Sequence, residues 1–120
     1  MRGLKVFLFI TFVIALVYGV IEIFLPAWLA GAKLGPQDAP SARYMGITFL
    51  AIALATWYTL RDPVRNIIVV RTLITMMAFF AVLALYHGVT GQESWSIALP
   101  GALGHGIIGV GLVLFYPRSE

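Results

Sequence analysis

Residues 95–116, WSIALPGALGHGIIGVGLVLFY, form an apolar run that is long enough to cross a lipid bilayer, because a transmembrane helix needs about 20 such residues. The run contains five glycines and a single histidine. Gly101, His105 and Gly109 recur every four residues and would share one face of a helix, where small side chains allow a neighbouring backbone to come close. The run therefore predicts a membrane-spanning helix whose glycine face packs against protein.

The composition of the whole chain agrees with a membrane protein. Of its 120 residues, 61% are hydrophobic and only 11% are charged, and the mean hydropathy is +0.96, values outside the range of soluble globular domains. The lack of cysteine in the sequence excludes disulfides, thiolate metal sites and thiol catalysis. The net charge is +3. In a membrane protein, the distribution of the basic residues between the loops is more informative than this total. We expect no nucleic-acid partner.

Three further apolar runs precede this one and complete the prediction of an all-α fold, a four-helix integral membrane bundle that forms a single transmembrane domain over residues 1–120. We expect the four spans at about residues 4–26, 43–61, 64–87 and 95–116. A cleaved signal peptide is the alternative for the first run, because Ala30-Gly31-Ala32 resembles a cleavage site. The run is longer than the usual core of a signal peptide, which favours a retained helix.

The connections between the runs carry turn and interface signals. Residues 26–42 contain three prolines and Trp28, so we expect an external loop or a segment at the lipid headgroups rather than a continued helix. In the sequence Arg61-Asp62-Pro63, Asp62 can cap a helix whose first position is Pro63, where the missing N–H costs nothing. The third helix is therefore predicted to begin at this turn and to cross the membrane from about Ile67 to Tyr86.

Basic residues indicate the orientation in the membrane. With four spans, the N-terminus, the 61–66 turn and the C-terminus lie on one side and carry most of the lysines and arginines, whereas the other side has only Lys33 and Arg43. By the positive-inside rule, both termini are predicted to be cytoplasmic. Arg71 lies about one turn inside the third span, and its side chain leans toward the cytoplasmic surface, so we interpret it as snorkelling.

Glu22 and His105 are the two ionisable residues deepest in the predicted spans. Counted from the interfacial Trp28 and Trp95, they differ in depth by about 6 Å, and their side chains lean toward each other. A hydrogen bond or ion pair between them would remove two polar groups from lipid, and intramembrane ionisable residues are candidates for function. Two structural alternatives stay open: Glu22 can pair with Arg43, and His105 can bond a carbonyl across a tight helix crossing.

No cofactor is required by the sequence. His87 is expected near the outer surface and His105 near the middle of its span, so the two do not share the depth that bis-histidine haem ligation needs. The small-residue face around His105 would admit a flat macrocycle supplied by a larger assembly, and a lipid or a quinone is a further candidate ligand. No metal-ligand spacing, nucleophile–base arrangement or phosphate-binding loop occurs in the sequence.

The segment Ala42-Arg43-Tyr44-Met45-Gly46 at the entry to the second span, followed by Asp62-Pro63 and Arg65-Asn66 before the third, resembles small bacterial four-helix membrane proteins of the DoxX-like and BphX-like kind. The resemblance covers most of the chain. It implies a compact four-helix bundle in the bacterial inner membrane and, in some of these families, an association with oxidoreductase or quinone-linked complexes. It carries no catalytic residues over to this chain.

Three functional hypotheses follow. We favour an accessory or interaction subunit that packs against another membrane protein, in a larger assembly such as a redox or quinone-associated one, or against a second copy of itself. The second is a binding module for a lipid, quinone or other hydrophobic ligand, with Glu22, Arg43 and His105 around a pocket open to the outer leaflet. The third, a proton-coupled transporter or membrane enzyme that uses Glu22 and His105, is the weakest, because polar groups for a path are few and broken-helix repeats are missing.

Because the sequence has no cysteine, single-cysteine variants test the predicted orientation directly. The Gln37→Cys variant should react with a membrane-impermeant thiol reagent added from outside the cell. The Arg65→Cys variant should react only after the cytoplasmic face is exposed, because residue 65 lies in a loop on the positive side. Labelling of Gln37→Cys only from the cytoplasm and of Arg65→Cys only from outside would invert the topology.

Overall fold

The computed structural model describes residues 1–32 and 37–117, and in this part of the chain the secondary structure is entirely helical. The helices are α1 (Arg2–Phe24), α2 (Pro26–Gly31), α3 (Ala39–Arg61), α4 (Ile67–Val89) and α5 (Trp95–Leu114). Three of them, α1, α4 and α5, are long and apolar enough to cross a membrane. The predicted all-α class is confirmed, and the arrangement of four spans in one bundle stays a prediction.

The segment expected to be a loop, residues 26–42, contains helical structure at both ends. α1 ends at Phe24, and the short helix α2 begins at Pro26, which occupies its first turn. Proline lacks the N–H that a continued helix needs and restricts the residue before it, so the chain stops one helix and starts another here. Lys33, which was assigned to the outer side from the sequence, lies outside the described residues.

α3 begins at Ala39, four residues before the predicted start of the second span, because Asp38 caps it. The Asp38 carboxylate accepts a hydrogen bond from the backbone N–H of Ser41 at 2.8 Å, which is the geometry of an N-cap side chain and the N3 amide. This hydrogen bond from Ser41 holds the pKa of the Asp38 carboxyl below its usual value. The signal was present in the sequence as Asp38 followed by Pro40 in the first turn.

The turn before α4 is capped as predicted, but the helix starts later. Asp62 Oδ1 accepts a hydrogen bond from the backbone N–H of Arg65 at 3.0 Å. The side-chain amide of Asn66 then donates to the Asp62 carbonyl at 2.9 Å, which closes residues 62–66 into a separate turn. α4 begins only after this turn, at Ile67, so the prediction that the helix starts at Pro63 was wrong.

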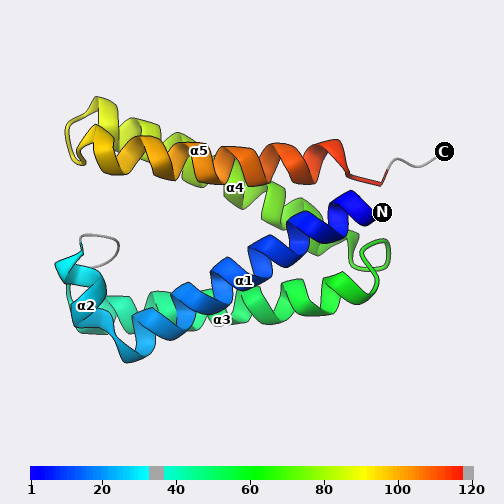
Figure 1. Cartoon of the computed structure of the whole chain (residues 1–120), viewed down its shortest axis with the longest axis horizontal. Coiled ribbons are helices and arrows are strands. Elements are labelled where there is room, and N and C mark those ends of the chain that lie inside the picture. Colours follow the sequence, from blue (N-terminus) through cyan, green and yellow to red (C-terminus); the bar gives the residue numbers. More distant parts are fainter. Residues whose placement is uncertain (33–36, 118–120) are drawn as a thin grey trace. The chain divides into compact units, whose positions relative to one another are not determined.

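The chain forms two compact units. The α4–α5 unit contains Met1–Phe7 and Asp62–Glu120, and the α1–α3 unit contains Leu8–Arg61. In the α4–α5 unit the two long helices lie side by side (Figure 1). The first residues of α1 belong to this unit and lie near the C-terminal end of α5, where the rings of Phe7 and Phe115 stack with centroids 5.9 Å apart.

In the α1–α3 unit, two glycines bring the backbones of the long helices close together. A Cβ atom added to Gly19 would lie 3.0 Å from the Gly46 carbonyl oxygen, and one added to Gly46 would lie 2.9 Å from the Gly19 carbonyl oxygen. Farther along, the rings of Phe12 and Trp57 are 5.2 Å apart. Because lower numbers on α1 meet higher numbers on α3, the two helices run antiparallel (Figure 1).

We predict that Gly46→Ala lowers the free energy of unfolding by about 1–3 kcal/mol, because the added methyl group would force the two backbones apart. Thermal unfolding in one detergent measures the effect. Gly104→Ala is the matched control, since no atom lies within 4 Å of the position its Cβ would take. Equal stability losses in the two variants would show that the crossing at Gly46 is not tightly packed.

Candidate functional site

Glu22 is the most unusual polar residue in the described part of the chain. It lies near the C-terminal end of α1, and only 1% of its surface is exposed. Its Oε2 atom is buried and has no hydrogen-bond partner. A polar group without a partner is costly in a medium that excludes water, so such a group in a membrane helix calls for an explanation.

Glu22 lies where α1 and α3 approach each other at Gly19 and Gly46. A Cβ atom at Gly46 would lie 3.1 Å from the Glu22 Cβ, so the carboxyl group extends from the point where the α1 and α3 backbones approach most closely. Two other buried polar residues of this unit are satisfied within their own helix, because Thr56 and Thr59 donate to carbonyls one turn earlier at 2.7 and 2.8 Å. Glu22 has no such local partner for Oε2.

The structure does not bring Glu22 and Arg43 together. Arg43 is exposed on α3, and the ion pairs of the described residues do not include one between these two side chains. His105 belongs to the other unit, so its pairing with Glu22 stays a prediction.

His105 has a hydrogen bond inside its own helix. Its Nδ1 donates to the Gly101 carbonyl, 2.7 Å away and one turn earlier, because a carbonyl oxygen can only accept. The expected bond across a helix crossing is therefore replaced by a local one. The ring also lies against Phe80 of α4, with centroids 5.1 Å apart. In the neutral imidazole this arrangement leaves Nε2 as an acceptor or metal ligand, so the predicted macrocycle at His105 stays a prediction.

The predicted glycine face of α5 lies against α4. A Cβ atom at Gly109 would be 3.1 Å from the Met77 Cβ, and one at Gly101 would be 3.8 Å from the Ala84 Cβ. Gly109 therefore marks the closer approach of the two. Gly19 and Gly46, which permit the backbone approach in the other unit, were not predicted as a packing pair from the sequence.

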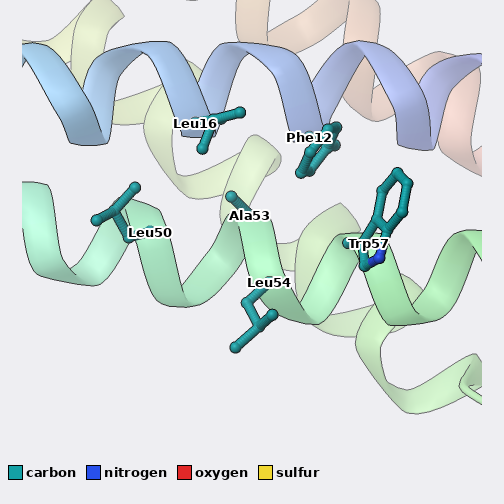
Figure 2. A pocket seen from close by; sticks show the side chains of 6 residues that line it. All are labelled: Phe12, Leu16, Leu50, Ala53, Leu54 and Trp57. Atoms are coloured by element: carbon teal, nitrogen blue, oxygen red, sulfur yellow. The ribbon is translucent and has the colours of Figure 1, made fainter.

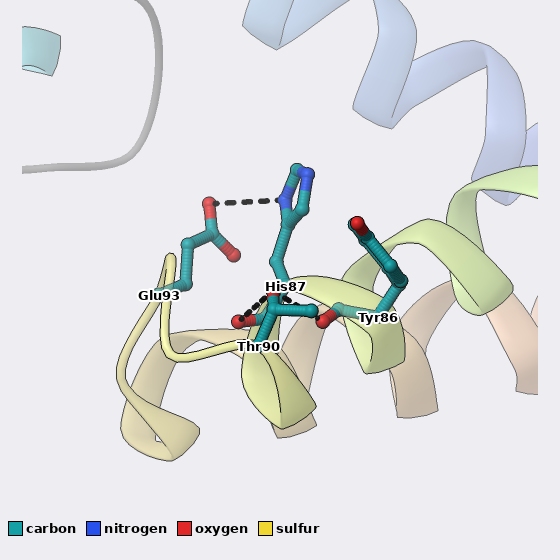
Figure 3. A network of polar contacts seen from close by, with 4 residues as sticks. All are labelled: Tyr86, His87, Thr90 and Glu93. Carbon is teal, nitrogen blue, oxygen red and sulfur yellow. Dashed lines mark hydrogen bonds and ion pairs between the residues drawn. The ribbon is translucent and has the colours of Figure 1, made fainter.

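Two contacts between polar side chains lie at the ends of the α4–α5 unit. Arg71 is exposed, and its Nε donates to the hydroxyl of Tyr116, while its guanidinium lies over the Tyr116 ring. At the other end, His87 Nδ1 lies 4.0 Å from Glu93 Oε1 in the turn that follows α4 (Figure 3). Both of these side chains are partly exposed, and the solvated position of His87 stays a prediction.

An apolar hollow opens along α1 and α3, away from Glu22. It has a volume of about 350 Å³ and is lined by Phe12, Leu16, Leu50, Ala53, Leu54 and Trp57. Figure 2 shows that Phe12 and Leu16 point from α1 toward α3, whereas Ala53 and Trp57 point back toward α1. The small side chain of Ala53 between larger neighbours leaves the space unfilled. The hollow was not predicted from the sequence, where the sign of it is a small residue, Ala53, among bulky ones.

The described residues do not include a group of three or more His, Asp or Glu side chains that could hold a metal ion. Comparisons with models of protein families, with curated proteins and with solved structures find no match for this chain. The resemblance to DoxX-like and BphX-like proteins therefore stays a prediction. The site is characterised by two features of the α1–α3 unit, the unpartnered Glu22 oxygen and the apolar hollow.

We predict that Glu22→Met raises the free energy of unfolding in detergent by about 1–3 kcal/mol, because it removes a buried acceptor that has no partner. Glu22→Gln is the matched control. It keeps a polar group in the same place and should gain less. A lower melting temperature for Glu22→Met would show that the carboxyl group has a partner in the intact protein, and His105 would then be the first candidate.

Proposed function

We propose that this chain is a multi-pass protein of the bacterial inner membrane with four spans and both termini in the cytoplasm. Three helices have the length and composition of spans. α3 is as long as α1, at 23 residues, and contacts α1 at points from Gly46 to Trp57. A helix that packs beside a membrane span over most of its length lies at the same depth in the membrane. This supports α3 as the remaining span.

We propose further that the protein binds the hydrocarbon part of a membrane lipid, or of a comparable apolar ligand such as a quinone, in the hollow along α1 and α3. The observation that carries this proposal is the hollow itself, about 350 Å³ with walls made of aromatic and aliphatic side chains. Its volume lies within the range of sites for small ligands, its lining is apolar, and it is open along the side of the unit, where a chain could enter.

The hollow is energetically unfavourable when it is empty. Water gains too few hydrogen bonds from side chains such as Leu16, Leu50 and Leu54 to occupy it. An empty space would deprive the lining atoms of dispersion contacts. A flexible hydrocarbon chain, which the surrounding bilayer supplies, restores these contacts without requiring a polar partner.

The accessory-subunit hypothesis stays a prediction beside this one. The two hypotheses differ in what they predict to remain bound to the protein after gentle extraction from the membrane. A binding module retains a small apolar ligand, whereas an interaction subunit retains another polypeptide. Native mass spectrometry distinguishes these outcomes by mass.

We predict that native mass spectra of the gently extracted protein show bound lipid or quinone, and that Leu16→Trp weakens the affinity for this ligand about tenfold, the effect of losing about 1.4 kcal/mol of contacts. The larger ring would occupy the hollow. Val17→Trp is the matched control, because Val17 is the next residue on α1, is exposed, and does not line the hollow. Equal retention of ligand by both variants would contradict binding in the hollow.

A further inference from the structure

Arg61, the last residue of α3, lies beside two aromatic rings at the end of the α1–α3 unit. Its guanidinium carbon lies 5.9 Å from the centroid of the Trp57 ring and 5.8 Å from that of the Tyr58 ring. Contacts of this kind attract a cation to the face of an aromatic ring. The side chain is exposed, and its N–H groups form no hydrogen bond or ion pair with the described residues of this unit.

Trp57 connects Arg61 to the hollow, because its ring both lines the hollow and contacts the guanidinium. Arg61 follows Trp57 by four residues, so it lies about 6 Å farther along the helix axis. Leu50, at the other end of the lining, lies about 16 Å from Arg61 along the same axis. A positive charge thus stands at one end of an elongated apolar site, at the level where Trp and Tyr mark the lipid headgroups.

This arrangement matches the two parts of a phospholipid. The hydrocarbon chain fits the apolar lining between Trp57 and Leu50, and the phosphate meets the free N–H groups of Arg61. Arginine suits this role because its planar fork donates two parallel hydrogen bonds to phosphate oxygens. A basic residue that served only to orient the protein in the membrane would not need two aromatic contacts that fix its position.

We propose that the α1–α3 unit carries a phospholipid site, in which one acyl chain occupies the hollow and the phosphate accepts hydrogen bonds from the Arg61 guanidinium. The inference rests on the proposed binding of an apolar ligand in the hollow, and adds the class of ligand and the residue that recognises its headgroup. The occupant is a glycerophospholipid of the surrounding membrane.

The test is a titration of delipidated protein in detergent with phosphatidylglycerol and with diacylglycerol of identical acyl chains, followed by native mass spectrometry. These two ligands share their hydrocarbon part and differ in the phosphate-containing headgroup. Wild-type protein should bind phosphatidylglycerol about tenfold more tightly, the factor expected for a charge-assisted hydrogen-bonded pair. Arg61→Gln should bind the two lipids equally, and Arg61→Lys, which keeps the charge without the fork, should retain only part of the preference.

Arg65→Gln is the matched control. It removes one positive charge from the turn that follows α3, and only the backbone N–H of Arg65 takes part in the hydrogen bond to Asp62. This variant should keep the full preference for phosphatidylglycerol. Melting temperatures of all variants, measured without lipid, identify any variant whose fold has changed, and a folded Arg61→Gln variant that keeps the full preference would overturn the proposal.

The Leu16→Trp variant separates failure of this inference from failure of the proposed function. If it lowers the binding of both lipids while Arg61→Gln changes neither, the hollow binds hydrocarbon and the phosphate contact is wrong. If Leu16→Trp leaves both affinities unchanged, binding in the hollow is itself wrong. Glycerol 3-phosphate, which has the phosphate without the chains, should not displace phosphatidylglycerol, and displacement by it would mean that Arg61 binds soluble anions and would overturn the lipid site.

Discussion

The close approach of two backbones at Gly19 and Gly46 is the constraint on which the α1–α3 unit depends. Association of helices in lipid gains little from the hydrophobic effect, because the lipid tails are as apolar as the side chains. Packing at short range then provides the stabilisation, and glycine permits it here, because a Cβ atom added to Gly19 or Gly46 would lie 3.0 or 2.9 Å from the carbonyl oxygen of the other residue.

The same crossing determines the environment of Glu22. Because Gly46 has no side chain, the Glu22 Cβ lies directly against the α3 backbone, and the carboxyl group becomes buried beside it. Its Oε2 atom has no hydrogen-bond partner, although Thr56 and Thr59, which are buried in the same unit, bond to their own helix. Unsatisfied buried groups are uncommon in native structures and gather at functional sites. Stability alone does not account for a carboxyl group at this position.

At the opposite end of the unit, the packing of α1 against α3 depends on the sizes of the side chains and not on a close approach of the two backbones. The rings of Phe12 and Trp57 contact each other there (Figure 2), and Ala53 is too small to fill the space between them and the leucines. An imperfection of this kind inside a soluble core would be filled by repacking or would reduce stability. In the lipid site that we propose, a hydrocarbon chain fills this space and becomes part of the packed structure. Arg61, placed by Trp57 and Tyr58, adds a polar end to that apolar site.

The sequence by itself determined where the four long helices lie, because apolar runs of sufficient length act locally. Its errors were also local: Asp38 caps α3 four residues early, and Asn66 delays α4 by closing a separate turn. It also identified Glu22 as an anomalous residue, because a carboxylate within an apolar run is expensive in any packing arrangement. Only the tertiary structure decided that Gly46 faces Gly19, that Oε2 of Glu22 has no partner, and that Ala53 leaves a hollow. These features depend on which face of one helix meets which face of another, and α1 and α3 are each apolar around most of their circumference, so periodicity within one helix does not contain that information.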